Sequence, residues 1–169
     1  MARYTIDPEA SQVWVAGTSS VHPIHATATG LEGWIDVEAG DGAVAAGTGL
    51  AGEVRIAVAA LRSGNGLVDR ETRRRIDARR HPEITGVVTG SDRVAGDRLS
   101  LRGDLTFRGE TRQVEGEVGV VVDDGGERIV LEGSQSFDVR DWGLEPPRFA
   151  MLKVHPGIDV RVHVEARRA

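Results

Sequence analysis

The chain has 169 residues, of which 40% are hydrophobic and 28% charged, a composition that excludes a disordered or fibrous protein. The length suits a single domain, residues 1–169, with one core, and the absence of Cys excludes disulfides, thiolate metal sites and a cysteine nucleophile. A net charge of -5 argues against nucleic acid as a partner, because contact with phosphates needs a basic surface.

We expect no targeting signal in the N-terminal segment as given. Residues 1–8 contain no apolar run of signal-peptide length, and no stretch of the chain approaches the roughly 18 apolar residues of a membrane span. We therefore expect a cytoplasmic location for the chain as given.

Alternation of apolar and polar residues, the pattern of strands with one solvent-exposed face, follows this segment. It predicts strands near residues 12–19, 26–38 and 47–59, with a turn signal at Asp41-Gly42. Between the first two, His22 and His25 lie three residues apart, a spacing that on a helix would suit metal binding. Because this segment is a turn with no Cys or acidic pair nearby, we expect no metal site here.

The stretch from residue 66 to residue 80 interrupts the alternation. Val68, Thr72 and Ile76 recur at a spacing of four, and the His81-Pro82 pair is a stop signal. These features predict one inserted α-helix over about residues 66–80, with a narrow apolar side.

Arginines cover the rest of the predicted helix: Arg70, Arg73, Arg74, Arg75, Arg79 and Arg80. Such a run is typical of a solvated face, supported here by Glu71 and Arg75 at i,i+4. The functional alternative is contact with an anionic head group, a phosphate or a membrane surface.

Five further strands follow the helix, the first near residues 84–94 and separated from the next by a turn at Gly96-Asp97. Residues 99–108 are apolar or Gly at every odd position and polar at every even one. Three later runs share the pattern, with Val114, Gly116, Val118, Val120 and Val122, then Ile129, Leu131, Gly133 and Phe137, then Ile158, Val160, Val162 and Val164 each on one side.

Together these elements predict a mainly β fold. Asp123-Asp124-Gly125-Gly126 contains a favoured hairpin pair, so the strands on either side of it should pair. About eight strands with short connections predict a single closed or nearly closed antiparallel β-barrel with one inserted helix. Eight strands leave an interior just large enough for side chains or one modest ligand.

Bulky apolar residues concentrate in one segment near the C-terminus. They are Trp142, Leu144, Pro146, Pro147, Phe149, Met151 and Leu152. Such a loop is either a flexible lid over the barrel or a permanent plug at one end of it.

Three segments in this order resemble the YceI-like, polyisoprenoid-binding family of lipocalin-like β-barrels. They are residues 4–7 (YTID) with 11–14 (SQVW), residues 101–112 (LRGDLTFRGETR) and residues 140–144 (RDWGL). Residues 63–65 and 81–84 bracket the helix as the family pattern does. The chain departs from that pattern at Thr85-Gly86, where the family usually has an aromatic residue, and in the absence of the usual export signal.

The resemblance implies an elongated apolar cavity for a polyisoprenoid, an isoprenoid quinone or another lipid, with no cofactor. If the apolar faces of the strands and the segment from Trp142 to Leu152, which we call the aromatic loop, surround such a cavity, their side chains are the expected ligand-binding residues. They are Val13, Val15, Leu31, Ile35, Val54, Ile56, Val58, Leu99, Leu101, Leu105, Phe107, Val118, Val120, Leu131, Phe137, Trp142 and Leu144.

The same residues are also compatible with a solid core. The small number of aromatic side chains favours a void, and so do the glycines Gly33, Gly103, Gly116 and Gly133. Glycines, however, also let strands bend into a barrel. A filled barrel would be a structural or interaction module whose Arg-rich helix or Trp142 loop contacts a partner, a membrane surface or a second copy as a homodimer.

Catalysis is the third hypothesis and has the least support. No Gly-x-Ser-x-Gly, phosphate-binding loop or His-Glu-x-x-His motif occurs. An enzyme would have to use His22, His25 or Asp141, and we therefore expect a binding protein with no catalytic residues and no metal.

Overall fold

The computed structural model describes residues 1–39, 44, 49–149 and 151–169. Within them the chain forms α1 (Gly66–Ile76), three short 3-10 helices and one sheet. The 3-10 helices are η1 (Val58–Ala60), η2 (Asp124–Gly126) and η3 (Val139–Trp142). The strands are β1 (Ala2–Ile6), β2 (Gln12–Ser19), β3 (Ile24–Thr29), β4 (Glu32–Val37), β5 (Ala51–Ala57), β6 (Glu83–Ala95), β7 (Arg98–Phe107), β8 (Glu110–Asp123), β9 (Arg128–Asp138), β10 (Arg148–Phe149) and β11 (Leu152–Arg168).

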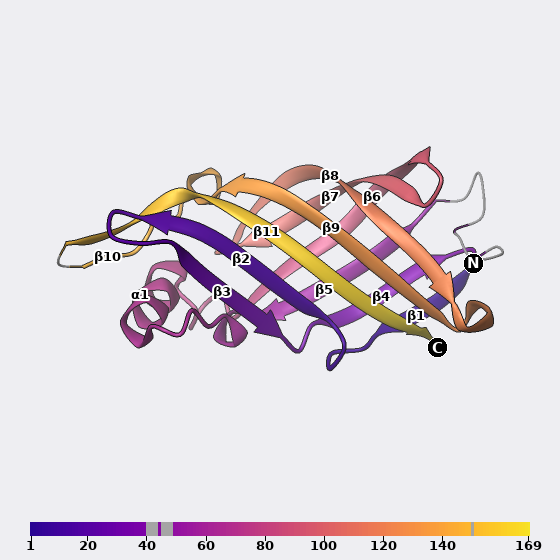
Figure 1. The fold of residues 1–169 in the computed structure, drawn as a ribbon, viewed down its shortest axis with the longest axis horizontal. Coiled ribbons are helices and arrows are strands. Elements are labelled where there is room, and N and C mark those ends of the chain that lie inside the picture. The colour runs from indigo at the N-terminus through magenta and orange to yellow at the C-terminus, as the bar shows by residue number, and fades with distance from the viewer. Residues whose placement is uncertain (40–43, 45–48, 150) are drawn as a thin grey trace.

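Eight of these strands close into an antiparallel barrel, as the sequence predicts. The order is β1-β4-β5-β6-β7-β8-β9-β11, and β11 returns to β1 with Tyr4 opposite Arg168 and Ile6 opposite Ala166. The predicted hairpin also forms, since β8 and β9 pair from Val118–Gly133 to Asp123–Arg128. The barrel is elongated, with α1 at one end and both chain termini at the other (Figure 1).

The eight barrel strands are not the eight that alternation predicts. The strand at residues 12–19 has the predicted bounds but lies outside the closed ring, as β2. The short strand β1, which alternation does not pick out, takes its place in the ring. Both fit beside β11 because this 17-residue strand pairs with β2 along residues 154–163 and with β1 along residues 166–168.

The predicted strand at residues 26–38 is wrong in one respect, because it is two strands, β3 and β4. Gly30 has a φ of 77°, a left-handed conformation that glycine adopts readily, and the chain reverses there. The predicted turn at Asp41-Gly42 and the first residues of the predicted strand 47–59 lie outside the described residues.

Helix α1 begins as predicted but ends four residues earlier, at Ile76. The Asn65 side chain caps its start by accepting hydrogen bonds from the N–H groups of Leu67 and Val68. Asp77 ends it in a left-handed conformation with a φ of 59°, and residues 77–80 continue as turns. Val68 and Ile76 are the buried side of the helix, which agrees with its narrow apolar stripe.

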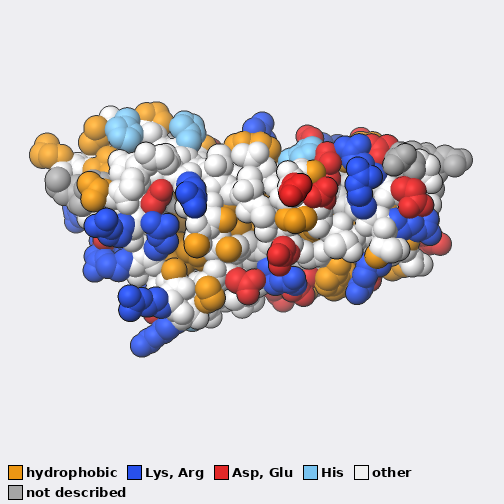
Figure 2. Space-filling model, turned by 90° about the horizontal axis from the view of Figure 1, so that it is seen from below, with side chains coloured by type: hydrophobic (Ala, Val, Ile, Leu, Met, Phe, Trp, Pro, Cys, Tyr) orange, Lys and Arg blue, Asp and Glu red, His pale blue; other side chains and the backbone are white. Residues whose placement is uncertain are grey.

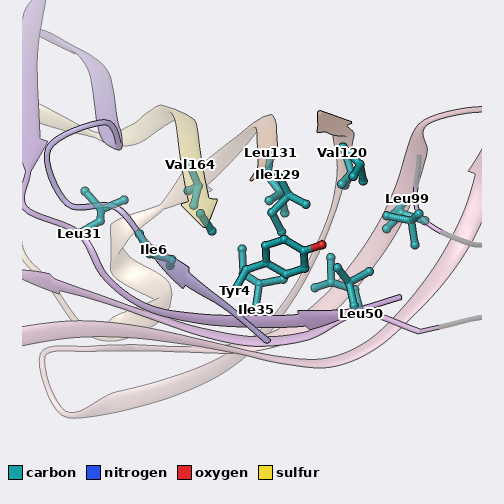
Figure 3. Close-up of a cluster of buried hydrophobic side chains, with 14 of the residues drawn as sticks. Tyr4, Ile6, Leu31, Ile35, Leu50, Leu99, Val120, Ile129, Leu131 and Val164 are labelled. Carbon is teal, nitrogen blue, oxygen red and sulfur yellow. The ribbon is translucent and has the colours of Figure 1, made fainter. Parts of the chain in front are cut away.

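Apolar side chains fill the barrel at the end where the termini lie, which we call the solid end. Tyr4 is fully buried there among Ile35, Ile129 and Leu131 (Figure 3), and its hydroxyl donates a 2.6 Å hydrogen bond to the carbonyl of Gly126. A smaller cluster of Val58, Ile76 and Leu144 lies under α1 at the opposite end.

Candidate functional site: an apolar cavity inside the barrel

A cavity of about 280 Å³ adjoins the solid end inside the barrel. Each of the eight barrel strands contributes to its wall, from Ile6 on β1 to Val164 on β11. Its inward-facing aliphatic residues include Val54, Val88, Leu101, Leu105, Val114, Val118, Leu131, Val160 and Val162. The barrel is therefore solid at one end and hollow in its middle.

Seven of the seventeen expected ligand-binding residues line this cavity. They are Ile35, Val54, Leu101, Leu105, Val118, Leu131 and Phe137. They come from β4, β5, β7, β8 and β9, so the alternating pattern brings together residues that are far apart in the sequence.

The other ten do not line it. Val13, Leu31, Leu99 and Val120 are buried in the large apolar cluster, with Val15 and Ile56 packed against that cluster, and Val13 and Val15 lie on β2, outside the closed ring. Val58 and Leu144 belong to the cluster under α1, with Phe107 packed against that cluster. Trp142 contacts Phe107 and Phe137 edge-on, with ring centroids 6.5 and 5.8 Å away.

Glycines account for the hollow. Five neighbouring strands, β5 to β9, each place one glycine in the cavity wall, namely Gly52, Gly86, Gly103, Gly116 and Gly133. A Cβ at Gly86 would meet only the side chains of Val54 and Leu105, at 3.4 and 3.9 Å, so the missing side chain leaves open space.

Two of the same glycines also allow close strand approach. A Cβ at Gly103 would lie 2.6 Å from the carbonyl oxygen of Val87, and one at Gly133 would lie 2.9 Å from that of Glu117. Both interpretations therefore apply at different positions: some glycines leave empty space, and others allow the strands to bend and approach each other. Gly33 serves only the second, because it does not line the cavity and a Cβ there would overlap the Glu53 backbone.

The aromatic loop plugs the cavity on the side of α1. Trp142 is only 4% exposed, and its indole N–H donates a 3.0 Å hydrogen bond to the carbonyl of Leu105. Leu144 is buried against Ile76 and Val58, whereas Met151 at the loop tip is 87% exposed. Of the two alternatives, the Trp142 part of the loop is a plug; the side chain of Phe149 lies outside the described part of the chain.

The barrel wall is open on one side, between β8 and β9. Their ladder stops at Val118 and Gly133. Among the described residues, no hydrogen bond or ion pair joins residues 110–117 of β8 to residues 134–138 of β9. We call this opening the β8–β9 gap.

Charged residues beside the cavity direct their side chains outward. Arg102 donates a 2.6 Å hydrogen bond to Asp92, and Arg98 donates a 3.0 Å hydrogen bond to Glu117. The bond to Asp92 also raises the pKa of Arg102 above its ordinary value. The cavity is therefore an apolar space inside a wall that carries these charged groups on its outer surface.

The basic helix is remote from the cavity. No residue of α1 lines it. Figure 2 shows Lys and Arg side chains gathered at the end of the molecule where Figure 1 places α1. Glu71 accepts hydrogen bonds from both Arg74 and Arg75, and these lower the pKa of Glu71 below its ordinary value. Two of the arginine charges on this surface are therefore paired within the helix, and the Glu71–Arg75 pair has the i,i+4 spacing that the sequence predicts.

The two histidines offer no ligand set. The predicted turn contains only His22, because His25 lies on β3, opposite Ala16 of β2. Both side chains are exposed, and a ring nitrogen of His22 lies 2.8 Å from the carbonyl oxygen of Pro23. Across the described ranges, no group of three or more His, Cys, Asp or Glu side chains is placed to hold a metal ion. None of the described helices has the length and apolar character needed to cross a membrane.

Comparison with known proteins gives a family model, described as a YceI-like domain, that matches residues 4–166. Among solved structures, BcnA of Burkholderia cenocepacia superposes with a TM-score of 0.81 at 16% identity, over 95% of this chain and 99% of that chain. A polyisoprenoid-binding domain of Saccharophagus degradans, implicated in plant cell wall breakdown, gives 0.78 at 13% identity over 100% of both chains. The YCEI protein of Campylobacter jejuni gives 0.68 at 15% identity, over 85% and 84%. No curated protein matches the sequence.

Proposed function

Because this chain belongs to the YceI-like family, we propose that it binds a long-chain apolar amphiphile, such as a polyisoprenoid, an isoprenoid quinone or a lipid, inside the barrel. The observation that carries the proposal is the cavity of about 280 Å³ walled by all eight strands. The polyisoprenoid-binding domain of Saccharophagus degradans, which has the same fold, supports the choice of ligand class.

Desolvation alone supplies enough affinity for such a ligand. Burying one methylene contributes about 0.8 kcal/mol, so ten of them favour binding by about 8 kcal/mol before entropic losses. Small-molecule sites usually occupy about 300–1,000 Å³. The volume here is near the lower limit, which favours a single slender tail over a lipid with several bulky ones.

The hollow also favours a ligand over the alternative of a structural module with a filled barrel. One water molecule takes about 30 Å³ of liquid volume, so the cavity is far larger than the water-sized voids of a close-packed interior. Apolar cavities of this kind bind apolar molecules rather than water. Binding and carriage, not catalysis, is therefore the function we propose.

Ligand retention tests the proposal directly. Native mass spectrometry of the purified protein, followed by solvent extraction, should reveal a bound apolar molecule, and stripped protein should bind farnesol in a fluorescence titration. A uniformly ligand-free protein that also fails to bind farnesol would contradict the proposal.

A cavity-filling variant sharpens this test. In Gly86→Leu the new side chain extends from the cavity wall beside Val54 and Leu105, so farnesol affinity should fall at least tenfold. Val94→Leu is the matched control, because Val94 lies on the same strand but is 51% exposed and away from the cavity. Equal affinities for the two variants would show that farnesol binds elsewhere.

A further inference from the structure

We propose that the β8–β9 gap is the mouth of the cavity, through which the tail enters sideways, and that an uncharged polar head group stays in this gap against Gln135. The inference rests on the proposed function and adds to it the route, the place of the head group and its chemical class.

The gap begins where the β8–β9 ladder ends, at Val118 and Gly133, and residues 110–117 of β8 are not paired with β9. Continuing the register from Val118 and Gly133 would place Gly116 opposite Gln135, but these two positions are not paired. Gly116 remains paired with Leu101 on β7, and Gln135 with Val160 on β11. Because each strand keeps its other neighbour, the seam between them can widen without unfolding either one.

Gln135 lies where the interior meets the surface. It lines the cavity and also two outer depressions, one towards Trp142 and one towards Glu132. Its amide oxygen lies 3.3 Å from the position that a Cβ of Gly116 would occupy, so the side chain reaches across the gap to β8. Within the described residues its amide makes no hydrogen bond, and the residue is exposed. Gln135 can therefore swing aside at little cost and can offer both a donor and an acceptor to a ligand.

The two ends of the barrel offer no comparable route. Tyr4 and its neighbours fill the solid end, and Tyr4 is anchored to the Gly126 carbonyl. Trp142 is buried and hydrogen-bonded to Leu105 at the other end. Passage at either end would require breaking packed contacts, whereas between β8 and β9 no backbone pairing has to break and the Gln135 side chain is not held by a hydrogen bond among the described residues.

The rim of the gap selects against an anionic head group. Five carboxylates and three arginines line the two outer depressions, and Arg140 pairs with Asp138, one of these carboxylates, at 2.6 Å. Each of the arginines already has a partner: Arg98 pairs with Glu117 at 3.0 Å, Arg112 with Glu110 at 3.6 Å, and Arg161 lies 4.4 Å over the Trp14 ring. A phosphate would meet net negative charge here, whereas a hydroxyl or carbonyl would find Gln135 and the neighbouring Ser134. No residue of α1 lines the cavity or either outer depression, so the arginines of α1 are not part of this rim.

Cross-linking the gap tests the route. The protein has no native Cys, so Glu115→Cys/Ser136→Cys provides two outward-facing thiols across the gap, to be joined by a short bismaleimide. Val121→Cys/Val130→Cys is the matched control, because these outward residues face each other where the same two strands are paired. Uptake and release of farnesol, followed by stopped-flow fluorescence, should slow at least tenfold in the first cross-linked protein and remain unchanged in the second. Capping the thiols with a monomaleimide controls for added bulk.

The outcomes separate this inference from the proposed function. If the cross-linked gap takes up farnesol as fast as the capped protein, the ligand enters elsewhere and the route is wrong while binding stands. If no form of the protein takes up farnesol, the proposed function itself fails, and the inference fails with it.

The head-group class is tested with two ligands that share one tail. Farnesol should bind at least tenfold more tightly than farnesyl phosphate. Glu115→Gln/Glu132→Gln, which removes two charges from the rim, should narrow that preference, whereas Glu9→Gln/Glu38→Gln, which removes the same charge from residues outside the depressions, should not. Equal or tighter binding of the phosphate by the unmodified protein would overturn the proposed head group.

Discussion

The solid end and the hollow middle of this barrel are built by the same eight strands, yet one is packed and the other is not. Large side chains such as Tyr4, Val120 and Ile129 meet in the solid end. Along the middle, five neighbouring strands present glycine to the interior. The difference lies in side-chain size at a few inward positions, and the strand arrangement is common to both regions.

The two regions also differ in their walls. The β8–β9 ladder is complete beside the packed core and stops beside the cavity. The β8–β9 pairing and the core packing therefore end at about the same depth in the barrel, and the region that could hold a ligand is also the region that could open.

The largest contrast should come from two leucines of β7 that share its inward face. Leu99→Ala, in the solid end, should lower the free energy of unfolding by about 2–5 kcal/mol, because it leaves a cavity in a packed core. Leu105→Ala should cost less than about 2 kcal/mol, because Leu105 already borders empty space. Urea denaturation measures both, and similar losses would contradict a difference in packing.

A smaller contrast is expected where the paired and open parts of the β8–β9 wall meet. Gly133→Ala should cost about 1–3 kcal/mol, because its Cβ would lie 2.9 Å from the Glu117 carbonyl oxygen and 3.0 Å from a Val118 methyl group. Gly116→Ala should be close to neutral, since its Cβ would meet only the movable end of Gln135. Thermal unfolding of the two variants provides the comparison, and a larger loss for Gly116→Ala would place the boundary elsewhere.

The smallest effect concerns an ion-pair group on the outside of the solid end. A 2.6 Å hydrogen bond from Arg128, with help from His163, holds the pKa of Glu165 below its ordinary value of 4.5. A lowered pKa contributes stability that is complete above about pH 4.5 and is lost as the pH falls through the folded-state value. Glu165→Gln should therefore be less stable at pH 7 and lose less on acidification, as urea midpoints between pH 7 and pH 3 would show. If the urea midpoints of the two proteins fell in parallel with pH, Glu165 would contribute nothing to the pH dependence of stability.

Local pattern was enough to predict most strands of the fold. β7, β8, β9 and β11 alternate clearly, because each has one face inside the barrel. Local pattern does not predict which strands close the ring. β1 is only five residues long, and β2 is equally suited to the ring by its pattern. The position along β11 at which each of them pairs decides which one closes it.

The site could be predicted only in part, for a related reason. Alternation identifies which side chains face inward, but not how deep along the barrel they lie. Leu99 and Leu105 are equivalent by pattern, and the long-range register places one in packed core and the other at a void. Gln135 was missed because it is polar at an inward position. Gly86 was noted only as a departure from the family pattern, because the space that it leaves is revealed by its neighbours Val54 and Leu105.

The seam between β1 and β11 has a consequence for biosynthesis. Tyr4 lies opposite Arg168, and the Ala169 N–H donates a 2.9 Å hydrogen bond to the carbonyl of Arg3. Until residues 166–168 have been synthesised the ring cannot close, so the edge of β1 that pairs with them stays open. We expect the apolar inner face of the sheet to be accessible during that interval, and aggregation to be favoured most at that stage.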